Sequence, residues 1–425
     1  MQSFSIPYGR GHLTGEVPEA RLTGVFTPAG LKGVDDETAE IEAALRNPIG
    51  APSLEELARG KRHAVVIVSD HTRPVPTRLL LPPILKRLRA AESAIRVSLL
   101  VATGCHRATS MTELREMLGA QIADNEEIVI HDSEDAKNLT HLGTLPSGGR
   151  LDVNRLAVEA DLLIGTGFIE PHFFAGFSGG RKCVLPGIAS RACVHENHCA
   201  PFIASPKART GLLEGNPIHA DMVAAGRMAK VAFILNVVLD GAHKVVRAFA
   251  GGMEAAHEAG CAFLRTRCVL RVPLSDIVIT SNGGYPLDQN VYQSVKGMTA
   301  GEAACREGGV IILCASCCDG VGGEAFRKVL SAMETPQGLL RQIEAVPREA
   351  TTPDQWQYQI LARVLSRHTV IIVTTDCDHN LLRSMHFPCA STIGEALRMA
   401  EAFVGADAKV AVIPDGVSVI VEGQP

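Results

Sequence analysis

Residues with acid–base, cationic or metal-ligating chemistry follow four apolar runs of this 425-residue chain. Each run leads into a segment whose polar residues the packing of a strand does not need: residues 70–74, 105–107, 168–172 and 285–297. Parallel strands present their carboxyl ends at one edge of a sheet, where open α/β sheets bind ligands. We expect the first three segments to lie together if their strands share a sheet, and the fourth to face them across a cleft.

Each of these residues also has an ordinary structural interpretation. Asp70 suits a helix cap, and Arg73 suits a solvated surface position. His106 and His172 could equally be partly buried structural histidines. The combination of four such strand ends is what favours a functional site.

A glycine-rich segment, GFSGGRK at residues 176–182, follows the third run. It is not a nucleotide-binding P-loop, because that pattern needs glycine where Arg181 stands. Glycines 176, 179 and 180 would let backbone amides approach an anion such as a phosphate. The alternative is that Lys182 is an exposed loop charge.

Two clusters raise the question of a metal site. The segment Cys193–Cys199 contains His195 and His198, but its H-E-N-H spacing is one residue short of the H-E-x-x-H zinc motif. Four ligands packed this closely do not easily surround a tetrahedral ion, which favours one histidine ligating a metal held mainly by another group. The cysteines of residues 314–318 lack a companion pair, and buried thiols are the simpler interpretation.

The elements that must position these residues alternate between buried strands and helices. Strands are expected at 63–70, 95–104, 126–132, 160–167, 230–239, 275–284, 308–316, 368–376 and 409–416. Continuous apolar runs are typical of strands covered on both faces of a parallel sheet. A capping box at Ser110–Glu113 predicts a helix that ends at Gly119, and helical spacing recurs in 354–367 and 392–404.

The alternation predicts an α/β protein with two doubly wound domains and the active site in the cleft between them. We place the boundary near residue 270. The N-terminal domain is then residues 1–270 and the C-terminal domain residues 271–405. A return of residues 406–425 to the N-terminal domain is one alternative for the end of the chain.

Composition narrows the classes of function. Hydrophobic residues make up 46% and charged residues 20% of the chain, which excludes extended disorder. The net charge is −5 and no basic block stands out, so nucleic acid is not an expected partner. The longest apolar stretches fall far short of the ~20 residues that span a bilayer. The start of the chain lacks the pattern of a signal peptide, and we expect a soluble cytoplasmic protein with no membrane partner.

Five motifs resemble the nickel-pincer lactate racemase family: SDHTRP (69–74), ATGCHRAT (102–109), GFIEPHFFAGFSGGRKCVLPG (167–187), His198 within ENHCA, and DQNVYQSVKG (288–297). They span most of the chain in the family's order and spacing. The resemblance implies the family's fold, two α/β domains with the active site between them. It also implies the nickel-pincer nucleotide as cofactor, Ni(II)-pyridinium-3,5-bisthiocarboxylic acid mononucleotide, and a need for cofactor-biosynthesis proteins.

The resemblance also implies roles for single residues. Lys182 resembles the lysine that bonds the cofactor covalently as a thioamide, and His198 resembles the protein ligand to nickel. His106 and His172 resemble the family's two acid/base histidines.

Two further groups resemble the residues that contact cofactor and substrate. The group that resembles the cofactor contacts is Asp70, His71, Thr72 and Arg73. The group that resembles the substrate side is Arg73, Tyr292, Gln293 and Lys296, with Trp356 lining the pocket.

The family's reaction explains these residue types. The α-hydrogen of a 2-hydroxy acid is not acidic enough for a side chain alone, so a hydride acceptor gives a 2-keto acid that takes the hydride back on its other face. Two histidines of near-neutral pKa serve the hydroxyl proton, one for each substrate orientation. A cation such as Lys296 or Arg73 would hold the carboxylate. The expected enzyme is an isomerase, a racemase or epimerase of lactate, malate or another 2-hydroxy acid.

Two other functions fit parts of the sequence. A nicotinamide-dependent 2-hydroxy acid dehydrogenase is disfavoured, because no G-x-G-x-x-G follows a strand with an acidic residue about 20 positions later. A non-catalytic binder of an anionic metabolite or mononucleotide would keep the glycine loop and the cations. Such a binder would not need both His106 and His172.

Overall fold

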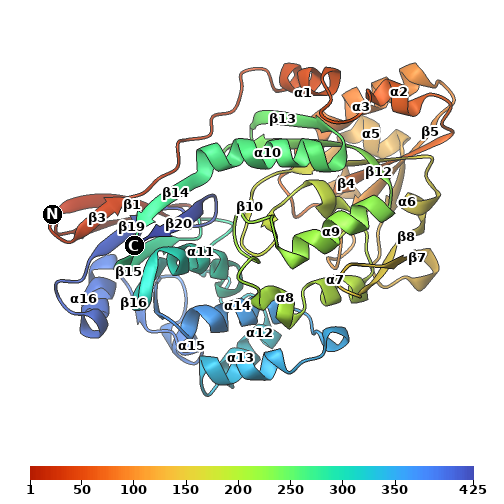
Figure 1. The fold of residues 1–425 in the computed structure, drawn as a ribbon. Coiled ribbons are helices and arrows are strands. Elements are labelled where there is room, and N and C mark those ends of the chain that lie inside the picture. Colours follow the sequence, from red (N-terminus) through yellow and green to blue (C-terminus); the bar gives the residue numbers. More distant parts are fainter. The chain divides into compact units, whose positions relative to one another are not determined.

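The structure is a computed structural model that describes residues 1–425, and the chain forms two compact units. The large unit contains residues 30–198 and 205–266, and the small unit contains residues 1–29, 199–204 and 267–425. Each unit is built on one six-stranded sheet (Figure 1). No helix has both the length and the apolar character needed to cross a bilayer.

The sheet of the large unit is parallel except at one edge. Its strand order is β13-β12-β9-β4-β5-β6, and only the β12–β13 pair is antiparallel. Its strands are β4 (His63–Ser69), β5 (Arg96–Ala102), β6 (Glu127–Ile130), β9 (Leu162–Phe168), β12 (Val231–Leu239) and β13 (Val245–Gly251). The chain winds from β4 to β5 and β6 on one side, then returns to build β9, β12 and β13 on the other. The direction of winding therefore reverses between β4 and β9.

Both faces of this sheet are buried. Val66 and Val68 of β4 belong to the core that the first helices of the unit cover, whereas Val65 and Ile67 are buried on the opposite face. Covering on both faces explains why the strand is continuously apolar in sequence.

Helices and short hairpins complete the large unit. The helices are α1 (Glu37–Arg46), α2 (Leu54–Ala58), α3 (Thr77–Ala91), α4 (Met111–Leu118), α5 (Ala120–Asn125), α6 (Arg155–Glu159), α7 (Arg191–Asn197), α9 (Pro217–Met228) and α10 (Met253–Cys268). Two 3₁₀ helices are η1 (Ala136–Asn138) and η2 (Gly180–Cys183). The hairpins are β7 (Leu139–Thr144) with β8 (Arg150–Asn154), and β10 (Pro171–His172) with β11 (Gly176–Phe177). The predicted capping box of α4 is present, with Gly119 as its C-cap.

The six-stranded sheet of the small unit is entirely parallel, with the order β18-β17-β16-β15-β19-β3. Its strands are β3 (Leu22–Val25), β15 (Ser275–Ser281), β16 (Cys305–Cys314), β17 (Thr369–Val373), β18 (Cys389–Ala390) and β19 (Val410–Ile413). The other strands are β1 (Gln2–Tyr8), β2 (Gly11–Val17), β14 (Val269–Pro273) and β20 (Ile420–Gln424). The helices are α8 (Ala200–Ala204), α11 (Val291–Ala304), α12 (Glu324–Ser331), α13 (Pro336–Glu344), η3 (Arg348–Ala350), α14 (Gln355–Leu365), α15 (His379–Arg383) and α16 (Ile393–Val404).

Both ends of the chain belong to the small unit. β3 pairs with β19, β20 pairs with β14, and Phe4 and Ile6 of the β1–β2 hairpin lie in the core of this unit. The N-terminal strands (red) accordingly lie beside the C-terminal ones (blue) in Figure 1. This corrects the predicted division, which assigned residues 1–29 to the N-terminal domain and allowed residues 406–425 to return to it. The strand pairing places both ends of the chain in the small unit, because β19 pairs with β15 on one side and with β3 on the other.

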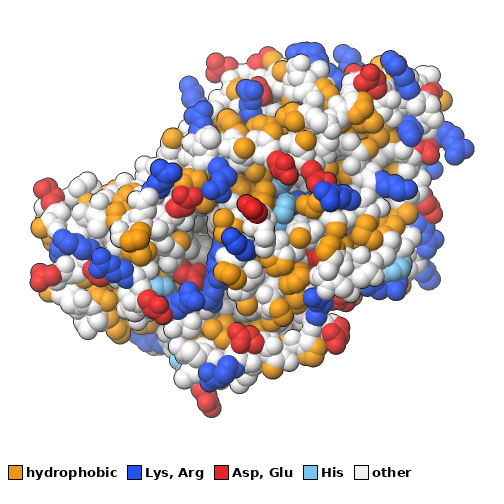
Figure 2. All heavy atoms as spheres, in the orientation of Figure 1, with side chains coloured by type: hydrophobic (Ala, Val, Ile, Leu, Met, Phe, Trp, Pro, Cys, Tyr) orange, Lys and Arg blue, Asp and Glu red, His pale blue; other side chains and the backbone are white.

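The predicted fold class is confirmed, because both sheets are parallel-dominated and helices connect their strands. All nine predicted strands are present, with ends that differ by a few residues. Basic and acidic side chains are interspersed over the face that Figure 2 shows, in keeping with a near-balanced charge.

Candidate active site

The carboxyl ends of β9, β4 and β5 lie side by side, since β4 pairs with both of the other strands. The segments that begin at Asp70, Cys105 and Ile169 follow these three ends. The predicted clustering of the first three strand ends at one sheet edge is therefore confirmed. The edge also contains the reversal of winding between β4 and β9, which is where open α/β sheets bind ligands.

Asp70 and His106 form a carboxylate–imidazole pair at this edge. Oδ2 of Asp70 lies 2.8 Å from Nδ1 of His106, and Thr72 Oγ1 donates to Oδ1 of the same carboxylate at 2.8 Å. Because a carboxylate only accepts, the neutral form of His106 has its proton on Nδ1 and its lone pair on Nε2. Burial raises the pKa of Asp70, but hydrogen bonds from His106 and Thr72 outweigh burial, and the pKa lies below its ordinary value.

The neighbouring residues of the same segment are held in other ways. His71 Nδ1 lies 3.1 Å from Thr109 Oγ1, which ties His71 to the loop before α4. The Arg73 amide donates to the Asp70 carbonyl at 3.2 Å, and its side chain is exposed. Arg73 is thus a cation at the surface of the large unit, while Asp70 is buried.

His172 ends the two-residue strand β10, opposite Gly176 of β11. The Ala175 amide donates to His172 Nδ1 at 3.3 Å. A neutral His172 therefore carries its proton on Nε2, the reverse of His106. The short hairpin fixes one ring nitrogen and thereby decides which nitrogen carries the proton.

The glycines of the GFSGGRK segment are required by backbone conformation and by packing. Gly176 has φ +78°, and a Cβ there would lie 2.4 Å from the Leu212 carbonyl oxygen. Gly180 has φ +53°, and its Cβ would lie 2.6 Å from the ring of His257. Residues with a side chain rarely adopt such φ values.

The amides of this loop mostly have protein acceptors. Gly180 N–H donates to Oδ1 of the buried Asn236 at 2.6 Å, and Ser178 N–H donates to the Glu170 carbonyl at 2.9 Å. Lys182 N–H donates to the Gly179 carbonyl at 3.1 Å. The prediction that this loop offers its amides to an anion is therefore wrong for Gly180.

The ring of Phe174 brings three of the predicted site residues together. Its centroid lies 4.5 Å from that of His172, 5.1 Å from that of His198 and 5.9 Å from Nζ of Lys182. Both imidazoles meet the ring edge-on. Lys182, His172 and His198 thus surround one aromatic side chain, although up to 26 positions separate them in sequence.

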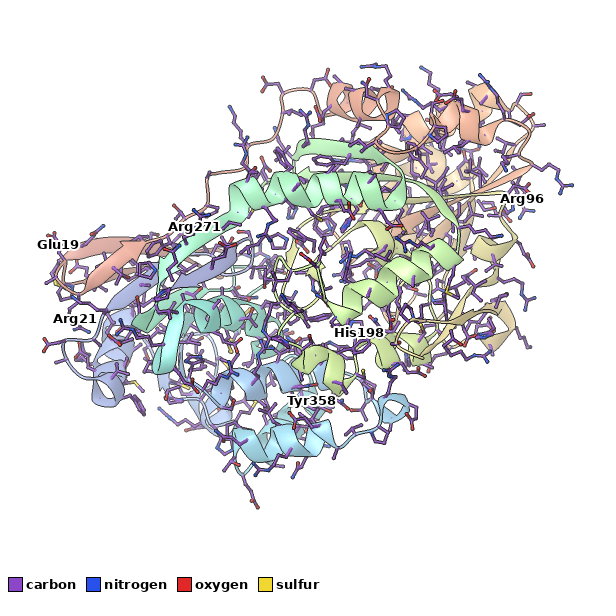
Figure 3. All side chains as sticks on the ribbon, viewed as in Figure 1. Glu19, Arg21, Arg96, His198, Arg271 and Tyr358 are labelled. Atoms are coloured by element: carbon purple, nitrogen blue, oxygen red, sulfur yellow. The ribbon has the colours of Figure 1, made fainter.

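His198 has the hydrogen bonding of a metal-binding histidine. It follows directly on α7, where Figure 3 labels it, and Nδ1 donates to the Val194 carbonyl at 2.8 Å. Burial and the nearby Lys182 ammonium lower the pKa of His198 to about 3. The neutral ring then carries its lone pair on Nε2, the form in which imidazole binds metals. The chain brings no three His, Cys, Asp or Glu side chains together as a metal site, so a metal at His198 needs its other ligands from a bound group.

The four remaining predicted residues belong to the small unit. Tyr292, Gln293 and Lys296 lie within the first two turns of α11, where their spacing places them on one side of the helix. Gly297 lets this helix approach β15, because a Cβ there would lie 2.5 Å from the Ser281 carbonyl oxygen.

Tyr292 contacts the carboxylate of Asp354, which lies 62 positions further along the chain. Its hydroxyl donates to Oδ1 of Asp354 at 2.7 Å. Burial and this carboxylate raise the pKa of Tyr292, and a hydrogen bond from Trp356 partly offsets them. Tyr292, Asp354 and Trp356 therefore form one cluster, and Asp354 does not cap the helix α14 that it precedes.

The cysteine clusters give no sign of metal chemistry. Cys314 and Cys317 are buried, Cys318 is exposed, and burial raises the pKa of Cys314 to about 12. Cys193 is a buried thiol whose pKa burial raises to about 12.

Comparison with known proteins identifies the family. Residues 8–211 match the family model of the lactate racemase N-terminal domain, and residues 271–421 match that of the C-terminal domain. The chain belongs to the lactate racemase family. Two curated lactate racemases are similar along their whole length. That of Thermoanaerobacterium thermosaccharolyticum is 52% identical over 99% of both chains, and that of Lactiplantibacillus plantarum is 50% identical over 99% of this chain and 100% of its own.

Solved structures agree with this assignment. The lactate racemase apoprotein of T. thermosaccharolyticum superposes with a TM-score of 0.95 at 51% identity, covering 99% of this chain and 100% of its own. A Thermotoga maritima protein, 21% identical, superposes with a TM-score of 0.61 over 92% of this chain and 100% of its own, and shows a shared fold.

In this lactate racemase family member, three residues that the sequence had given no role make contacts at the site: Phe174, Asn236 and Asp354. Asn236 could have been noticed as the one polar residue in the apolar run 231–239, and Phe174 lies in one of the five motifs. Asp354 gave no signal of its contact with Tyr292. The roles of His106, His172, Lys182 and His198 stay predictions.

Proposed function

We propose that this chain is a lactate racemase, an isomerase that interconverts the two enantiomers of lactate. The observation that carries the proposal is identity of 50% or more to two curated lactate racemases over essentially the whole chain. The arrangement of His106, His172, Lys182 and His198 within one unit supports the same conclusion. Malate and other 2-hydroxy acids are the substrates against which lactate must be compared.

We further propose that the chain carries the nickel-pincer nucleotide, with Lys182 as the covalent attachment and His198 as the nickel ligand. The neutral imidazole of His198, its proton held at Nδ1 by Val194, suits this ligand role. One histidine would complete the coordination of a nickel ion whose other ligands the cofactor provides. When bound, the cofactor supplies an acceptor for the α-hydrogen of lactate as hydride.

The chain's own part in the reaction is proton transfer and positioning. His106, with its lone pair on Nε2, takes the hydroxyl proton of the enantiomer that faces it. The Asp70 carboxylate holds the ring in this tautomer and stabilises the imidazolium that forms. His172 serves the other enantiomer, whose hydroxyl proton its neutral form takes at Nδ1 in place of the long contact with the Ala175 amide. In its protonated form it returns a proton to the oxygen when the turnover began at His106.

The remaining predicted residues are proposed to contact cofactor and substrate. We assign His71 and Thr72, with Asp70 and Arg73, to the cofactor. Arg73, Tyr292, Gln293 and Lys296 are assigned to the substrate carboxylate, with Trp356 lining the pocket. Cationic side chains suit a carboxylate, which they bind by charge-assisted hydrogen bonds.

The test is racemisation by protein produced with and without the cofactor-biosynthesis proteins. Protein from the complete pathway should carry about one nickel per chain, as one histidine ligand implies, and should convert either lactate enantiomer to the racemic mixture on a chiral column. Protein made without the pathway should be inactive. Faster conversion of malate than of lactate by the nickel-loaded protein would overturn the substrate assignment.

Covalent attachment is tested separately. Intact-mass spectrometry should find a cofactor adduct on the wild-type chain and none on Lys182→Ala. An adduct that survives in the variant would refute the assignment of Lys182.

A further inference from the structure

Asp354 combines a costly backbone conformation with a side chain that does not cap its helix. It immediately precedes α14, and its φ of +63° lies in the left-handed region, where glycine is the usual residue. An aspartate at the start of a helix ordinarily caps it, but this side chain makes no capping hydrogen bond. Backbone conformations of this kind cluster at functional sites, which directs attention to what the carboxylate contacts instead.

The carboxylate of Asp354 holds the hydroxyl of Tyr292. Oδ1 accepts from this hydroxyl at 2.7 Å, and the hydroxyl oxygen in turn accepts a hydrogen bond from the side chain of Trp356. An indole nitrogen only donates and an ionised carboxylate only accepts, so the direction of both hydrogen bonds is fixed. The hydroxyl proton of Tyr292 therefore points to Asp354, and a lone pair of the same oxygen faces Trp356.

The two helices that carry these residues are also held together by other contacts. Towards their C-terminal ends, Arg363 of α14 and Glu302 of α11 form a largely buried ion pair with two hydrogen bonds, of 2.9 and 2.7 Å. Towards their N-terminal ends, the side-chain amide of Gln357 donates to the Tyr292 carbonyl. Loss of the Asp354 carboxylate therefore leaves the helices packed and releases the hydroxyl of Tyr292.

We propose that Asp354 is a positioning residue for Trp356, which it holds through the hydroxyl of Tyr292. The role of Trp356 as a wall of the substrate pocket rests on the proposed function, whereas the hydrogen bonds do not.

The proposal also narrows the role of Tyr292 on the substrate side. Its hydroxyl proton is held by Asp354, so Tyr292 does not donate a hydrogen bond to the substrate carboxylate. Gln293 and Lys296 are then the donors that α11 supplies to the carboxylate, and Tyr292 contributes by orienting Trp356.

Matched variants separate the carboxylate from the backbone conformation. Asp354→Gly removes the carboxylate and keeps the left-handed conformation, which glycine adopts without strain. Asp354→Asn tolerates the same conformation and keeps an oxygen that can accept from Tyr292. Tyr358→Phe is the control for Tyr292→Phe, because the hydroxyl of Tyr358, labelled in Figure 3, lies on the same helix as Trp356 but contacts Thr352 Oγ1 at 2.9 Å.

The first experiment uses the apoprotein and needs no activity. The chain has one tryptophan, so protein labelled with ¹⁵N-tryptophan gives a single indole N–H signal by NMR. Tyr358→Phe should leave this signal in place, and Tyr292→Phe should move it upfield in the proton dimension because the hydrogen bond is lost. Asp354→Gly should move it in the same direction, and Asp354→Asn should move it less.

An indole signal of Asp354→Gly identical to that of the wild type would overturn the proposal. Tyr292→Phe covers the case in which Asp354→Gly does not fold, because an unchanged indole signal in Tyr292→Phe would contradict the proposal as well.

The second experiment measures racemisation of lactate by the nickel-loaded enzyme. Misplaced groups cost on the order of 100-fold, so Asp354→Gly should lose about that much in kcat/KM, and Asp354→Asn should recover most of the loss. If the aspartate served only the turn before α14, glycine would replace it without loss. Wild-type rates in Asp354→Gly would therefore overturn the proposal.

A double variant tests whether Asp354 acts through Tyr292. Asp354→Gly combined with Tyr292→Phe should lose about as much as Tyr292→Phe alone, because both substitutions break the same chain of hydrogen bonds. Losses that multiply would contradict the proposal. A nickel-loaded wild-type enzyme that does not racemise lactate would instead refute the proposed function and leave the NMR result standing.

Discussion

Oδ2 of Asp70 lies 2.8 Å from Nδ1 of His106, so residues that follow two adjacent strands, 36 positions apart, form one carboxylate–imidazole pair. We expect Asp70→Asn to lower kcat for racemisation by about 10²–10⁴-fold, because an amide allows the wrong tautomer of His106. Steady-state rates from both lactate enantiomers measure the effect.

Asp161→Asn is the control for this substitution. It makes the same change in the same sheet, at the opposite ends of the strands, where Asp161 accepts from the amides of Arg62 and His63. Its rates should stay close to those of the wild type. Wild-type rates in Asp70→Asn would show that His106 does not depend on this carboxylate.

The two histidines should serve opposite enantiomers. His106→Ala and His172→Ala should each slow overall racemisation by the ~10²–10⁴-fold typical of lost acid–base catalysis, because every turnover passes through both. In single turnovers, each variant should still form pyruvate quickly from one enantiomer, and the preferred enantiomer should differ between the variants. The double variant should lose much less than the product of the single losses. If both variants form pyruvate equally fast from both enantiomers in single turnovers, neither histidine is the group that takes the hydroxyl proton.

Part of this site could be predicted from sequence because strand ends are local features. The apolar runs at 63–70, 95–104 and 160–167 predicted both the strands and the edge at which they meet. The pairing of Asp70 with His106 could not be predicted, because it depends on β4 and β5 being neighbours in register, with Ser69 opposite Ala102. The contact of Tyr292 with Asp354 depends in the same way on how two helices pack.

For the fold, too, one part could be predicted from sequence and another could not. Long buried strands such as β4 were visible as continuous apolar runs. The four-residue edge strand β3 was not, and residues 1–29 were therefore assigned to the other domain. A short edge strand gains its stability from its neighbour β19 and leaves little pattern in its own sequence.

Nickel retention should distinguish two histidines three positions apart. His198→Ala should lose nickel far more than His195→Ala, because His198 is buried and neutral with its Nδ1 proton held by Val194. Elemental analysis of purified protein from cells with the cofactor pathway measures the difference. Equal nickel loss in the two variants would refute the choice of His198.

The half-buried His219 should make folding pH-dependent. Burial and Arg181 lower its pKa to about 4, against about 6.5 for histidine in an unfolded chain. Between these values the unfolded chain binds the extra proton, so stability falls as pH falls from 6.5 towards 4. At pH 5, His219→Gln should take up about one proton fewer on unfolding than the wild type.

Calorimetry of the apoprotein in two buffers of different ionisation enthalpy counts these protons. At pH 8, where neither state protonates the ring, the variant and the wild type should take up the same number. If His219→Gln leaves the proton uptake on unfolding at pH 5 unchanged, His219 has the same pKa in the folded and the unfolded chain, and the prediction is wrong.

The fate of the α-hydrogen distinguishes hydride transfer from proton abstraction. In the proposed reaction the histidines move only the hydroxyl proton, while the α-hydrogen leaves as hydride and returns to the same carbon. Racemisation of unlabelled L-lactate in D₂O should therefore give D-lactate that keeps protium at Cα, as read by NMR or mass spectrometry. Deuterium at Cα in the D-lactate formed would contradict hydride transfer, because it would mean that a side chain removes the α-hydrogen as a proton.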